Sequence, residues 1–305
     1  MDKKLSGVSQ TMSRFRGWIQ AGATLLTNLH LPNFLKGGLY QGAGKTVCVP
    51  GLNCYSCPAA SGACPIGAFQ AVVGSSKFSF SYYITGFLIL LGVLLGRFIC
   101  GFLCPFGWFQ ELLHKIPTKK LSTKKLMPLT YLKYAVLLVM VLLLPAFLVN
   151  DVGMGDPFFC KYLCPQGVLE GAIPLSLANS GIRAALGKLF TWKFSILLSV
   201  IVLSVVFYRP FCKWLCPLGA FYALFNRVSL FQMKVDKSKC VSCGKCARAC
   251  KMDVDVTKTP NHTECIRCGM CIRACPTNAV CFRYGFGDGK EKENAATLRE
   301  NNNKA

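Results

Sequence analysis

The sequence predicts an α-helical integral membrane protein of about four transmembrane helices, followed by a small cysteine-rich α+β domain at the C-terminal end. Three observations support this fold class. The 305 residues are 52% hydrophobic and only 16% charged, whereas a soluble domain carries about 25% charged residues. The hydrophobic residues gather in four windows, and the 19 cysteines follow short repeated spacings.

Four windows are free or nearly free of charge: Gly17–Leu35, Phe78–Gly96, Tyr134–Asn150 and Phe194–Tyr208. A helix needs roughly 20 residues to cross the hydrocarbon layer of a membrane. The second window has this length alone. The last two reach it by including Lys133 or Lys193, whose ammonium groups are expected to snorkel to the interface. The first window contains several polar residues, so an interfacial helix is the alternative for it.

The formal net charge is +22, and its distribution indicates a membrane protein. Basic residues are concentrated before the first window, between the second and third, and after the fourth. This alternation follows the positive-inside rule, so it predicts a multi-pass protein of a prokaryotic cytoplasmic (inner) membrane with both termini in the cytoplasm. Membrane lipid is the expected partner of the basic surface, and binding to nucleic acid is not expected.

Two runs near the C-terminal end, Cys240–Cys250 and Cys265–Cys275, share the spacing C-x2-C-x2-C-x3-C. In two-cluster ferredoxins the first three cysteines of such a run hold one [4Fe–4S] cluster and the fourth reaches the other cluster. This rule assigns the first cluster, site A, to Cys240, Cys243, Cys246 and Cys275. It assigns the second cluster, site B, to Cys265, Cys268, Cys271 and Cys250. A zinc ribbon, the alternative, leaves the third and fourth cysteines of each run unexplained.

These runs divide the chain into three predicted parts. Residues 1–228 form a four-helix transmembrane domain with cysteine motifs at the membrane faces, and residues 229–286 form a two-cluster ferredoxin-like domain. The tail, residues 287–305, is polar and charged without apolar periodicity, so we expect it to be disordered.

Four short motifs of the form C-P-x-G recur in the membrane part, one after each window, at Cys64, Cys104, Cys164 and Cys216. Three of them have a second cysteine four residues earlier, at Cys100, Cys160 and Cys212. The alternation of windows and motifs places two C-x3-C-P motifs on the cytoplasmic face. Their cysteines, the inner group, are a candidate third cluster site: Cys100, Cys104, Cys212 and Cys216. The alternative is a pair of thiols that cycles through a disulfide or binds a metal ion transiently.

Six cysteines are expected on the opposite face: Cys48, Cys54, Cys57, Cys64, Cys160 and Cys164. One cluster needs four thiolates, so two ligand sets are candidates for this outer site. One set consists of Cys48, Cys54, Cys57 and Cys64 alone, and the other is a mixed set that recruits Cys160 and Cys164. Disulfides are the alternative for exported cysteines, and six cysteines allow fifteen pairings.

The chain resembles the NapH-type membrane ferredoxins, which group with the NosR and CcoG polyferredoxin membrane proteins. The similar part extends from Arg14 to about Phe282 and is most specific in Cys100–Pro105, Cys212–Pro217 and Cys240–Pro276. The family pattern has two membrane-face motifs, so the outer cysteines indicate a cysteine-enriched branch. The resemblance implies electron transfer between a membrane quinol or a cytoplasmic donor and a partner reductase.

The favoured hypothesis for function is an electron relay that joins the ferredoxin-like domain, the inner group and the outer cysteines. About 30 Å of hydrocarbon separates the two membrane faces, so a quinone between the spans is a further candidate cofactor. A thiol or copper reductase of the CcoG kind and a structural or assembly subunit are the alternatives. We find no nucleophilic triad, phosphate-binding glycine loop or paired catalytic carboxylates in the sequence, so a carrier or oxidoreductase subunit is favoured over a stand-alone enzyme.

The ferredoxin-like domain is basic. Residues 234–290 carry eleven basic and five acidic residues, and complementary charge favours encounter between redox partners. An acidic soluble ferredoxin or flavodoxin is therefore an expected partner, beside membrane-bound redox subunits.

Overall fold

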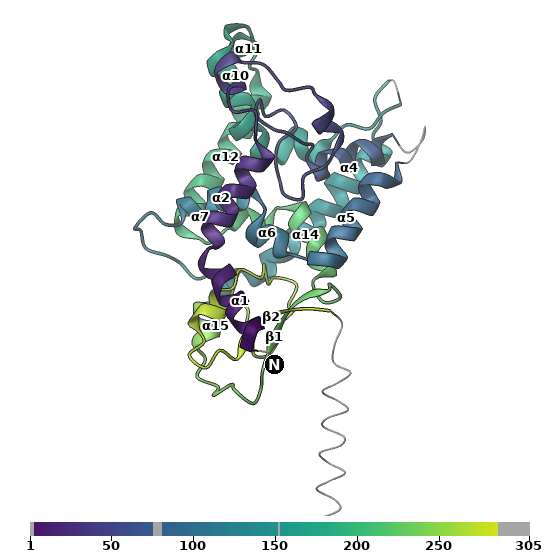
Figure 1. Ribbon diagram of the computed structural model, residues 1–305. Coiled ribbons are helices and arrows are strands. Elements are labelled where there is room, and N and C mark those ends of the chain that lie inside the picture. Colours follow the sequence, from purple (N-terminus) through teal and green to yellow (C-terminus); the bar gives the residue numbers. More distant parts are fainter. Residues whose placement is uncertain (1–2, 76–80, 152, 286–305) are drawn as a thin grey trace, which may run out of the picture.

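The computed structural model describes residues 3–75, 81–151 and 153–285. The tail at 287–305 and the beginning of the window Phe78–Gly96 lie outside the described residues. The cysteine-rich C-terminal module and the N-terminal helix lie at one end of the molecule, and the helices of the membrane part extend away from them (Figure 1). The predicted domain boundary at residue 228 remains a prediction about the sequence.

The described part is mostly helical. The helices before residue 120 are α1 (Lys3–Arg14), α2 (Arg16–Thr27), α3 (Asn33–Lys36), α4 (Pro65–Gly74), α5 (Tyr82–Leu95), α6 (Phe98–Phe102) and α7 (Pro105–Leu113), with a 3₁₀ turn at Ala43–Thr46. The later α-helices of the membrane part are α8 (Leu132–Val136), α9 (Leu144–Phe147), α10 (Ile173–Ala178), α11 (Ser180–Ala184), α12 (Lys188–Val206), α13 (Pro210–Trp214) and α14 (Pro217–Phe225). A 3₁₀ segment spans Lys124–Tyr131, and π-helical segments span Leu137–Leu143, Phe159–Leu163 and Gly167–Ala172.

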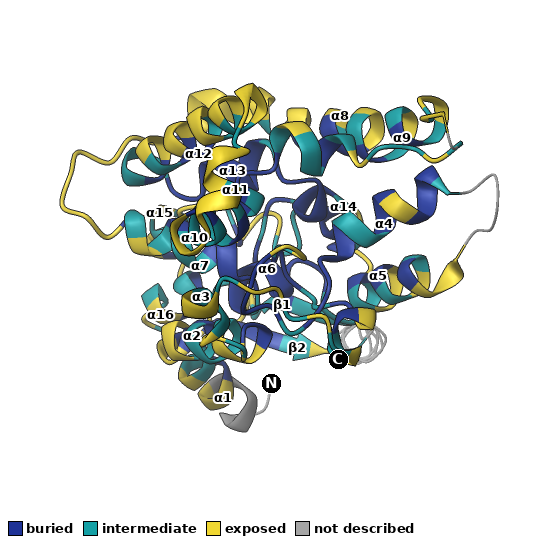
Figure 2. Ribbon diagram, turned by 90° about the horizontal axis from the view of Figure 1, so that it is seen from above, coloured by how far each residue is buried: buried dark blue, intermediate teal, exposed yellow. Residues whose placement is uncertain are grey.

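Two helical stretches are long and apolar enough to cross a membrane. They are Lys124–Phe147 with 24 residues and Lys188–Val206 with 19 residues. Only 28% and 17% of their apolar windows are buried inside the protein. Their outer faces are exposed in Figure 2, where the exposed positions of α12 lie at the edge of the molecule. An apolar surface that faces outward suits contact with lipid and is unlike the core helix of a soluble protein.

The other two predicted windows form shorter helices. Helix α5 has 14 residues, which is about 21 Å at 1.5 Å per residue. It ends at Gly96, whose positive φ of 54° turns the chain into α6. Helix α2 has 12 residues and buries the polar side chains of Arg16 and Gln20, while Trp18 is 78% exposed. This amphipathic pattern agrees with the interfacial alternative for the first window.

Three of the four C-P-x-G motifs begin a helix in the same way. Cys64, Cys104 and Cys216 are the N-cap residues of α4, α7 and α14, and the proline that follows each one is the first helical residue. Proline is favoured there because the first helical N–H has no partner within the helix. Each motif therefore places a cysteine at the beginning of a helix, where its thiol faces the protein interior.

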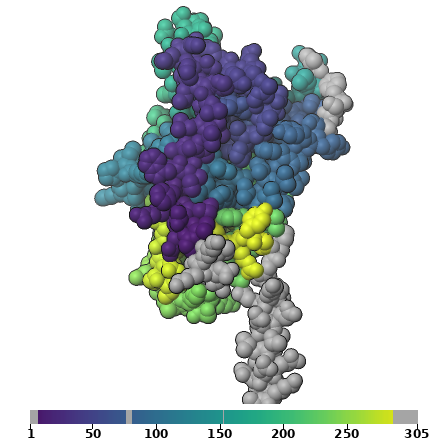
Figure 3. All heavy atoms as spheres, in the orientation of Figure 1, coloured from purple at the N-terminus to yellow at the C-terminus, as the bar shows by residue number. Residues whose placement is uncertain are grey.

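The C-terminal module contains an antiparallel pair of strands, β1 (Phe231–Val235) and β2 (Val280–Tyr284), with Met233 opposite Phe282. It also contains two short helices, α15 (Lys245–Ala249) and α16 (Met270–Ala274). Helix α1 packs against α16 and β2, and the atoms of α1 lie directly on the module in Figure 3.

An aromatic cluster connects the module to the membrane part. Phe98 in α6 lies 4.7 Å from Phe231, and Phe231 lies 5.0 Å from Phe282, measured between ring centroids. Aromatic pairs at these distances add stability beyond the area they bury. The module and the membrane part therefore share a hydrophobic core, and the module is more than a tethered carrier.

Candidate functional site: four groups of cysteines

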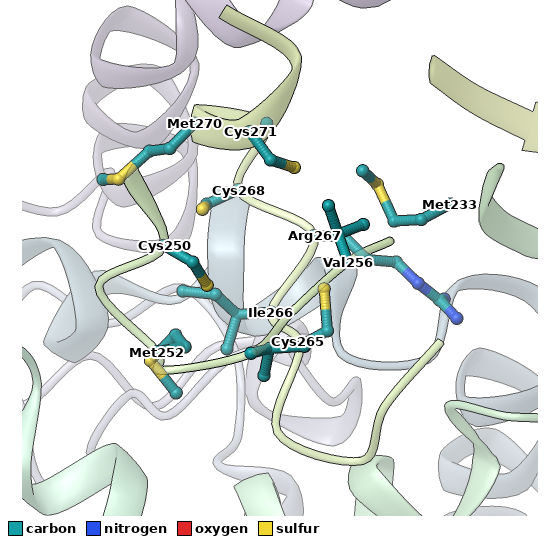
Figure 4. A pocket seen from close by; sticks show the side chains of 12 residues that line it. Met233, Cys250, Met252, Val256, Cys265, Ile266, Arg267, Cys268, Met270 and Cys271 are labelled. Carbon is teal, nitrogen blue, oxygen red and sulfur yellow. The ribbon is translucent and has the colours of Figure 1, made fainter. Parts of the chain in front are cut away.

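The structure brings the four predicted ligands of site B around one cavity. Cys250, Cys265, Cys268 and Cys271 line it together with apolar side chains that include Met233, Met252 and Met270. Figure 4 shows these four thiols on the wall of a single space. Cys250 comes from the first run and the other three from the second, as the spacing rule predicts.

The four predicted ligands of site A line a second cavity. Cys240, Cys243, Cys246 and Cys275 surround it with Thr257, Val280 and neighbouring residues. Each of the two cavities is thus lined by four thiols in the predicted grouping, which is the number of ligands that a [4Fe–4S] group needs.

The two runs also share an unusual backbone. Ser242 and Arg267, each immediately before the second cysteine of its run, have a φ of 51°, and Gly244 and Gly269 follow with φ of 68° and 76°. Left-handed conformations recur at matching positions because the chain must curl around the group that it holds. A Cβ on Gly269 would also lie 2.5 Å from Cβ of Ser13 in α1, so glycine is required there on both counts.

The environments of the thiols favour metal binding over free thiolates. Burial raises the pKa of the Cys265 thiol to about 12, so a thiolate there needs the positive charge of bound iron. Burial also disfavours the Cys275 thiolate, but hydrogen bonds from the Thr277 hydroxyl and nearby backbone N–H groups outweigh it and lower the pKa of Cys275. None of the 19 cysteines forms a disulfide.

No three His, Cys, Asp or Glu side chains in the described parts of the chain converge as ligands of one metal ion. This agrees with the cavities at sites A and B. Each thiolate of a [4Fe–4S] cluster binds a different iron atom, so the four sulfur atoms surround a volume instead of meeting at a point. The donor atoms also suit an iron–sulfur cluster, because thiolates are its preferred ligands.

The inner group is likewise assembled in space. The thiols of Cys104 and Cys216 interact electrostatically with those of Cys100 and Cys212, and all four residues are buried. Two arginines connect the motifs reciprocally. Arg97 donates to the carbonyl of Cys212, and Arg209 donates to the carbonyl of Cys100.

The inner group lies against site B. Gly101 stands between the two cysteines of the first inner motif, and a Cβ at this position would clash with the carbonyl oxygen of Ile266. Ile266 separates Cys265 from Arg267 and lines the site B cavity. Arg16 stabilises this contact from α2, because its Nε donates to the carbonyl of Gly101 at 2.9 Å.

The outer cysteines divide into two sets in the structure. The thiols of Cys54, Cys64, Cys160 and Cys164 interact electrostatically with one another. The Cys57 thiol donates to Oδ1 of Asn28 at 3.6 Å, and Cys57 packs with Ala59, Ala60 and Cys54. Cys48 is buried and interacts with Cys64. The structure therefore places the residues of the mixed set together and directs the neighbouring Cys57 thiol toward Asn28.

A longer repeat identifies residues that the four-residue motif misses. The residue six positions after each C-P cysteine is polar in all four copies: Gln70, Gln110, Glu170 and Tyr222. Gln70 and Gln110 donate to Sγ of Cys160 and Cys212 at 3.2 and 3.1 Å. Glu170 accepts the N–H of Cys54 at 3.0 Å, and Tyr222 donates to the carbonyl of Pro50 at 3.1 Å. Extending the motif by three residues would have revealed this repeated position.

Lys133 and Lys193 each have a polar partner within the protein. Lys133 is fully buried and pairs with Glu264 in the C-terminal module, and Arg97 reaches the same carboxylate at 3.0 Å. Lys193 donates to the carbonyl of Cys160 at 2.9 Å. Sequence alone could not show these partners, because they lie 131 and 33 residues away. The snorkelling expected of both ammonium groups stays a prediction.

Comparison with known proteins agrees with these groups. The 4Fe-4S binding domain family matches residues 62–82, 79–124, 133–173 and 189–238, which together cover about half of the chain, and each matched segment contains one C-P-x-G motif. The chain belongs to the 4Fe-4S binding domain family. The 4Fe-4S dicluster domain family matches residues 232–276, which contain sites A and B. No solved structure shows significant similarity to this iron–sulfur protein.

Relatives include both types of protein that the motifs resemble. An uncharacterised protein of Methanocaldococcus jannaschii is 31% identical over 209 residues, which are 65% of this chain and 77% of that protein. The ferredoxin-type protein NapH of Haemophilus influenzae is 27% identical over 36% of this chain and 52% of NapH. The regulatory protein NosR of Pseudomonas aeruginosa is 27% identical over 52% of this chain and 21% of NosR. The chain is thus a ferredoxin-type iron–sulfur protein, and it spans about half of NapH and a fifth of NosR.

Proposed function

We propose that this iron–sulfur protein is a membrane-bound electron carrier in which site A, site B and the inner group form one continuous path. The contact between Gly101 and Ile266 carries this proposal. It joins the backbone of an inner cysteine motif directly to the backbone of the site B run. A bound [4Fe–4S] group supplies the ability to accept and release one electron, and the chain supplies the short separation between groups.

The chain's own residues hold this path together. Glu264 next to site B receives two buried cations from the membrane part, Arg97 and Lys133. Asn226 at the end of α14 donates to the carbonyls of His262 and Cys265 at 2.6 and 2.9 Å. Hydrogen bonds and ion pairs inside a protein are stronger than in water, so this buried network favours one arrangement of the groups it joins. The module is therefore held in one position against the inner group, which a relay between fixed centres requires.

Burial separates the relay from the reductase alternative. The four inner cysteines are 5–7% exposed, so their thiols are withdrawn from metal ions or disulfides that arrive from solution. A copper or thiol reductase needs a reactive cysteine that meets its substrate. The inner group is better suited to holding a resident cluster, and its role is internal transfer.

The proposed topology follows the charges and the two apolar stretches. In this proposal Lys124–Phe147 and α12 span the membrane, α5 is a shorter apolar segment beside the cysteine groups, and α2 lies at the interface. The N-terminal helix α1 packs on the C-terminal module, which supports placing both on one side. The basic residues of that side assign it to the cytoplasm of a prokaryotic cell.

A cavity beside site B supports entry of electrons from a quinol. It lies between the helices α1, α2 and α7 and the module, has a volume of ≈ 530 Å³, and includes Cys268 in its wall. Trp18 and Trp108 supply aromatic surface, and Arg14 and Lys115 supply positive charge. Tryptophan and basic side chains are typical of the membrane interface, where a quinone head group resides. An acidic soluble carrier is the proposed donor at the basic surface of the module.

The substitution Gly101→Val tests the path. The added side chain must displace the Ile266 carbonyl, so the module moves away from the inner group while all cluster ligands remain. We expect iron content to stay at the wild-type level and the magnetic interaction between site B and the inner group, seen by EPR of the fully reduced protein, to weaken. Gly86→Val is the matched control, because a Cβ at Gly86 meets no atom within 4 Å.

Two results would contradict the proposal. One is a Gly101→Val protein whose transfer from the module to the inner group keeps its wild-type rate. The other is an anaerobically purified wild-type protein with only about eight iron atoms per chain, the number that sites A and B hold. The path through the inner group requires at least about twelve. A variant that lost electron transfer but still assembled its partners would favour the structural alternative.

A further inference from the structure

We propose that Cys54, Cys64, Cys160 and Cys164 hold a fourth [4Fe–4S] group, in a site that is a quasi-symmetric copy of the inner group. The inference deepens the proposed function, because a fourth site would extend the path beyond the inner group. It concerns the cysteines that set this chain apart from the pattern with two membrane-face motifs.

The two glutamines make the same contacts in the two groups. In the inner group Nε2 of Gln110 donates to Sγ of Cys212 at 3.1 Å, and Oε1 accepts the N–H of Phe211 at 3.1 Å. In the outer group Nε2 of Gln70 donates to Sγ of Cys160 at 3.2 Å, and Oε1 accepts the N–H of Phe159 at 3.0 Å. Each glutamine thus connects one C-P motif to the first cysteine of another motif. Both glutamines are fully buried.

The pairing of motifs follows from these contacts. The second and fourth motifs form the inner group, and the first and third motifs form the outer group. The sequences around the third and fourth motifs agree closely, F-C-K-Y-L-C-P-Q-G at 159–167 and F-C-K-W-L-C-P-L-G at 211–219. The third motif therefore offers the same two cysteines, at the same spacing, as the fourth. The outer group thus has ligands that correspond to those of the inner group.

One ligand of the outer group does not belong to a C-P-x-G motif or to the cysteine four residues before one. The first motif has Ala60 four residues before Cys64, where the second motif has Cys100 before Cys104. Cys54 supplies the thiol that this position lacks. A Cβ on Gly167, three residues after Cys164, would lie 3.7 Å from Sγ of Cys54, and a Cβ on Gly67, three residues after Cys64, would lie 3.8 Å from Sγ of Cys160. Glu170 holds the position by accepting the backbone N–H of Cys54, so a residue of the third motif fixes the substitute ligand.

The two remaining outer cysteines do not fit the ligand set. The Cys57 thiol is directed to Oδ1 of Asn28. Cys48 interacts with Cys64 but stands in a loop whose backbone pairs with Ala63. One cluster requires four thiolates, and the other four outer cysteines supply that number, so Cys48 and Cys57 are left for other roles.

Positive charge near the outer group suits an anionic cluster. A [4Fe–4S] group with four thiolates carries about two negative charges when oxidised. Lys193 donates to the carbonyl of Cys160, and Lys45 interacts electrostatically with Cys54 and Cys57. Glu170 is the acidic residue that faces the same thiols. The two lysines exceed the single carboxylate.

The loop that carries Cys48 and Cys54 folds inward and reaches the inner group. A Cβ on Gly51 would lie 2.8 Å from Cα of Cys104, and Leu52 and Asn53 are buried. Tyr222 lies between the groups, since it interacts electrostatically with Cys100 and Cys104 of the inner group and with Cys64 of the outer group. The two groups are therefore neighbours in the protein interior, and the full hydrocarbon thickness does not separate them.

The decisive experiment is iron and acid-labile sulfide analysis of anaerobically purified variants, with EPR of the reduced proteins. We expect about sixteen iron atoms in the wild-type protein, and about twelve in both Cys54→Ser and Cys164→Ser. Cys57→Ser and Cys48→Ser are matched controls from the same loop and are expected to keep the wild-type number. A wild-type content of about twelve would overturn the fourth site and leave the proposed function intact, whereas about eight would contradict both.

A second variant guards against loss of iron through misfolding. Gln70→Leu removes a hydrogen bond to Cys160 without removing a ligand, so we expect the iron content to be retained and the midpoint potential of one EPR signal to fall. An unchanged potential for every signal would overturn the assignment of Cys160. A loss of iron from Cys48→Ser, with full retention in Cys54→Ser, would overturn the ligand set proposed here.

Discussion

The inner and outer cysteine groups are two versions of one arrangement, and they differ in how each is stabilised. The inner group has two complete C-x3-C-P motifs and two arginines, Arg97 and Arg209, that each bind the opposite motif. The outer group has one complete C-x3-C-P motif, one C-P-x-G motif without the earlier cysteine, and a fourth cysteine that comes from a loop. In place of an arginine, the outer group has Lys193, which donates to the carbonyl of Cys160.

This difference shows what the arrangement needs and what it tolerates. The glutamine contact to the first cysteine of the partner motif occurs in both groups with the same atoms. The origin of the fourth cysteine and the identity of the basic residue vary. Internal duplication has thus preserved the framework of the two groups while their supporting residues have diverged.

The inner group touches the ferredoxin-type module. Arg97 serves the inner group and also binds Glu264 of the module at 3.0 Å. Arg209 pairs with Glu111 at 2.8 Å, and the same carboxylate receives Arg16 from α2. The inner group is therefore stabilised from the module and from α2, whereas the outer group is supported by Lys193 of α12 and by Glu170.

The largest effect is expected from removing the inner group. The double substitution Cys212→Ser and Cys216→Ser takes away two thiolates, so about four iron atoms per chain should be lost. Electrons supplied to the module should then no longer reach the outer group, as followed by EPR after reduction with a soluble donor. Cys281→Ser in β2 is the control and should leave both quantities unchanged. Continued reduction of the outer group at the wild-type rate would show that the path bypasses the inner group.

The grouping of the cysteines could largely be predicted from the sequence, because the spacing of cluster ligands is a local property of the chain. The eight cysteines of sites A and B surround two cavities in the grouping that the C-x2-C-x2-C-x3-C rule predicts. The four C-P-x-G motifs predicted a repeat, and the family matches follow the same segments. The chemistry of closely spaced thiols fixes these features with little help from tertiary structure.

The long-range features could not be predicted in the same way. The sequence does not show that Lys133 pairs with Glu264, because the two residues are 131 positions apart in the chain. The inward fold of the loop around Gly51 depends on its contact with Cys104, which no local spacing encodes. Two of the four apolar windows formed shorter helices than 20 residues, because polar residues and a glycine with positive φ interrupt them.

The next effect concerns the attachment of the module to the inner group. Glu264→Ala leaves Arg97 and Lys133 buried without their carboxylate, and breaking a buried ion pair costs about 3–5 kcal/mol. We expect a lower temperature of thermal unfolding and easier proteolytic release of the module. The control is Lys161→Ala, whose exposed pair with Asp156 at the membrane part contributes about 0–1 kcal/mol.

A Glu264→Ala protein as stable as the Lys161→Ala control would show that the module is held by the aromatic cluster around Phe98 and Phe231 alone. The result would separate the two contacts that join the halves of the molecule. It would also indicate whether the inner group depends on the module for its order, as the comparison with the outer group implies.

The smallest effect is the most direct test of the likeness between the two groups. Gln110→Leu and Gln70→Leu are matched substitutions, each of which removes one N–H donor from a cysteine sulfur at 3.1 or 3.2 Å. A hydrogen bond to the sulfur stabilises the more negative reduced cluster, so its loss should lower the midpoint potential by an amount on the order of tens of millivolts. Redox titration followed by EPR should show a shift in one signal for Gln110→Leu and in a different signal for Gln70→Leu. Shifts of similar size and the same sign in two distinct signals are expected only if both groups hold clusters in the same way. A shift of the same signal by both substitutions would mean that one cluster serves both glutamines, and the quasi-symmetric arrangement would have to be abandoned.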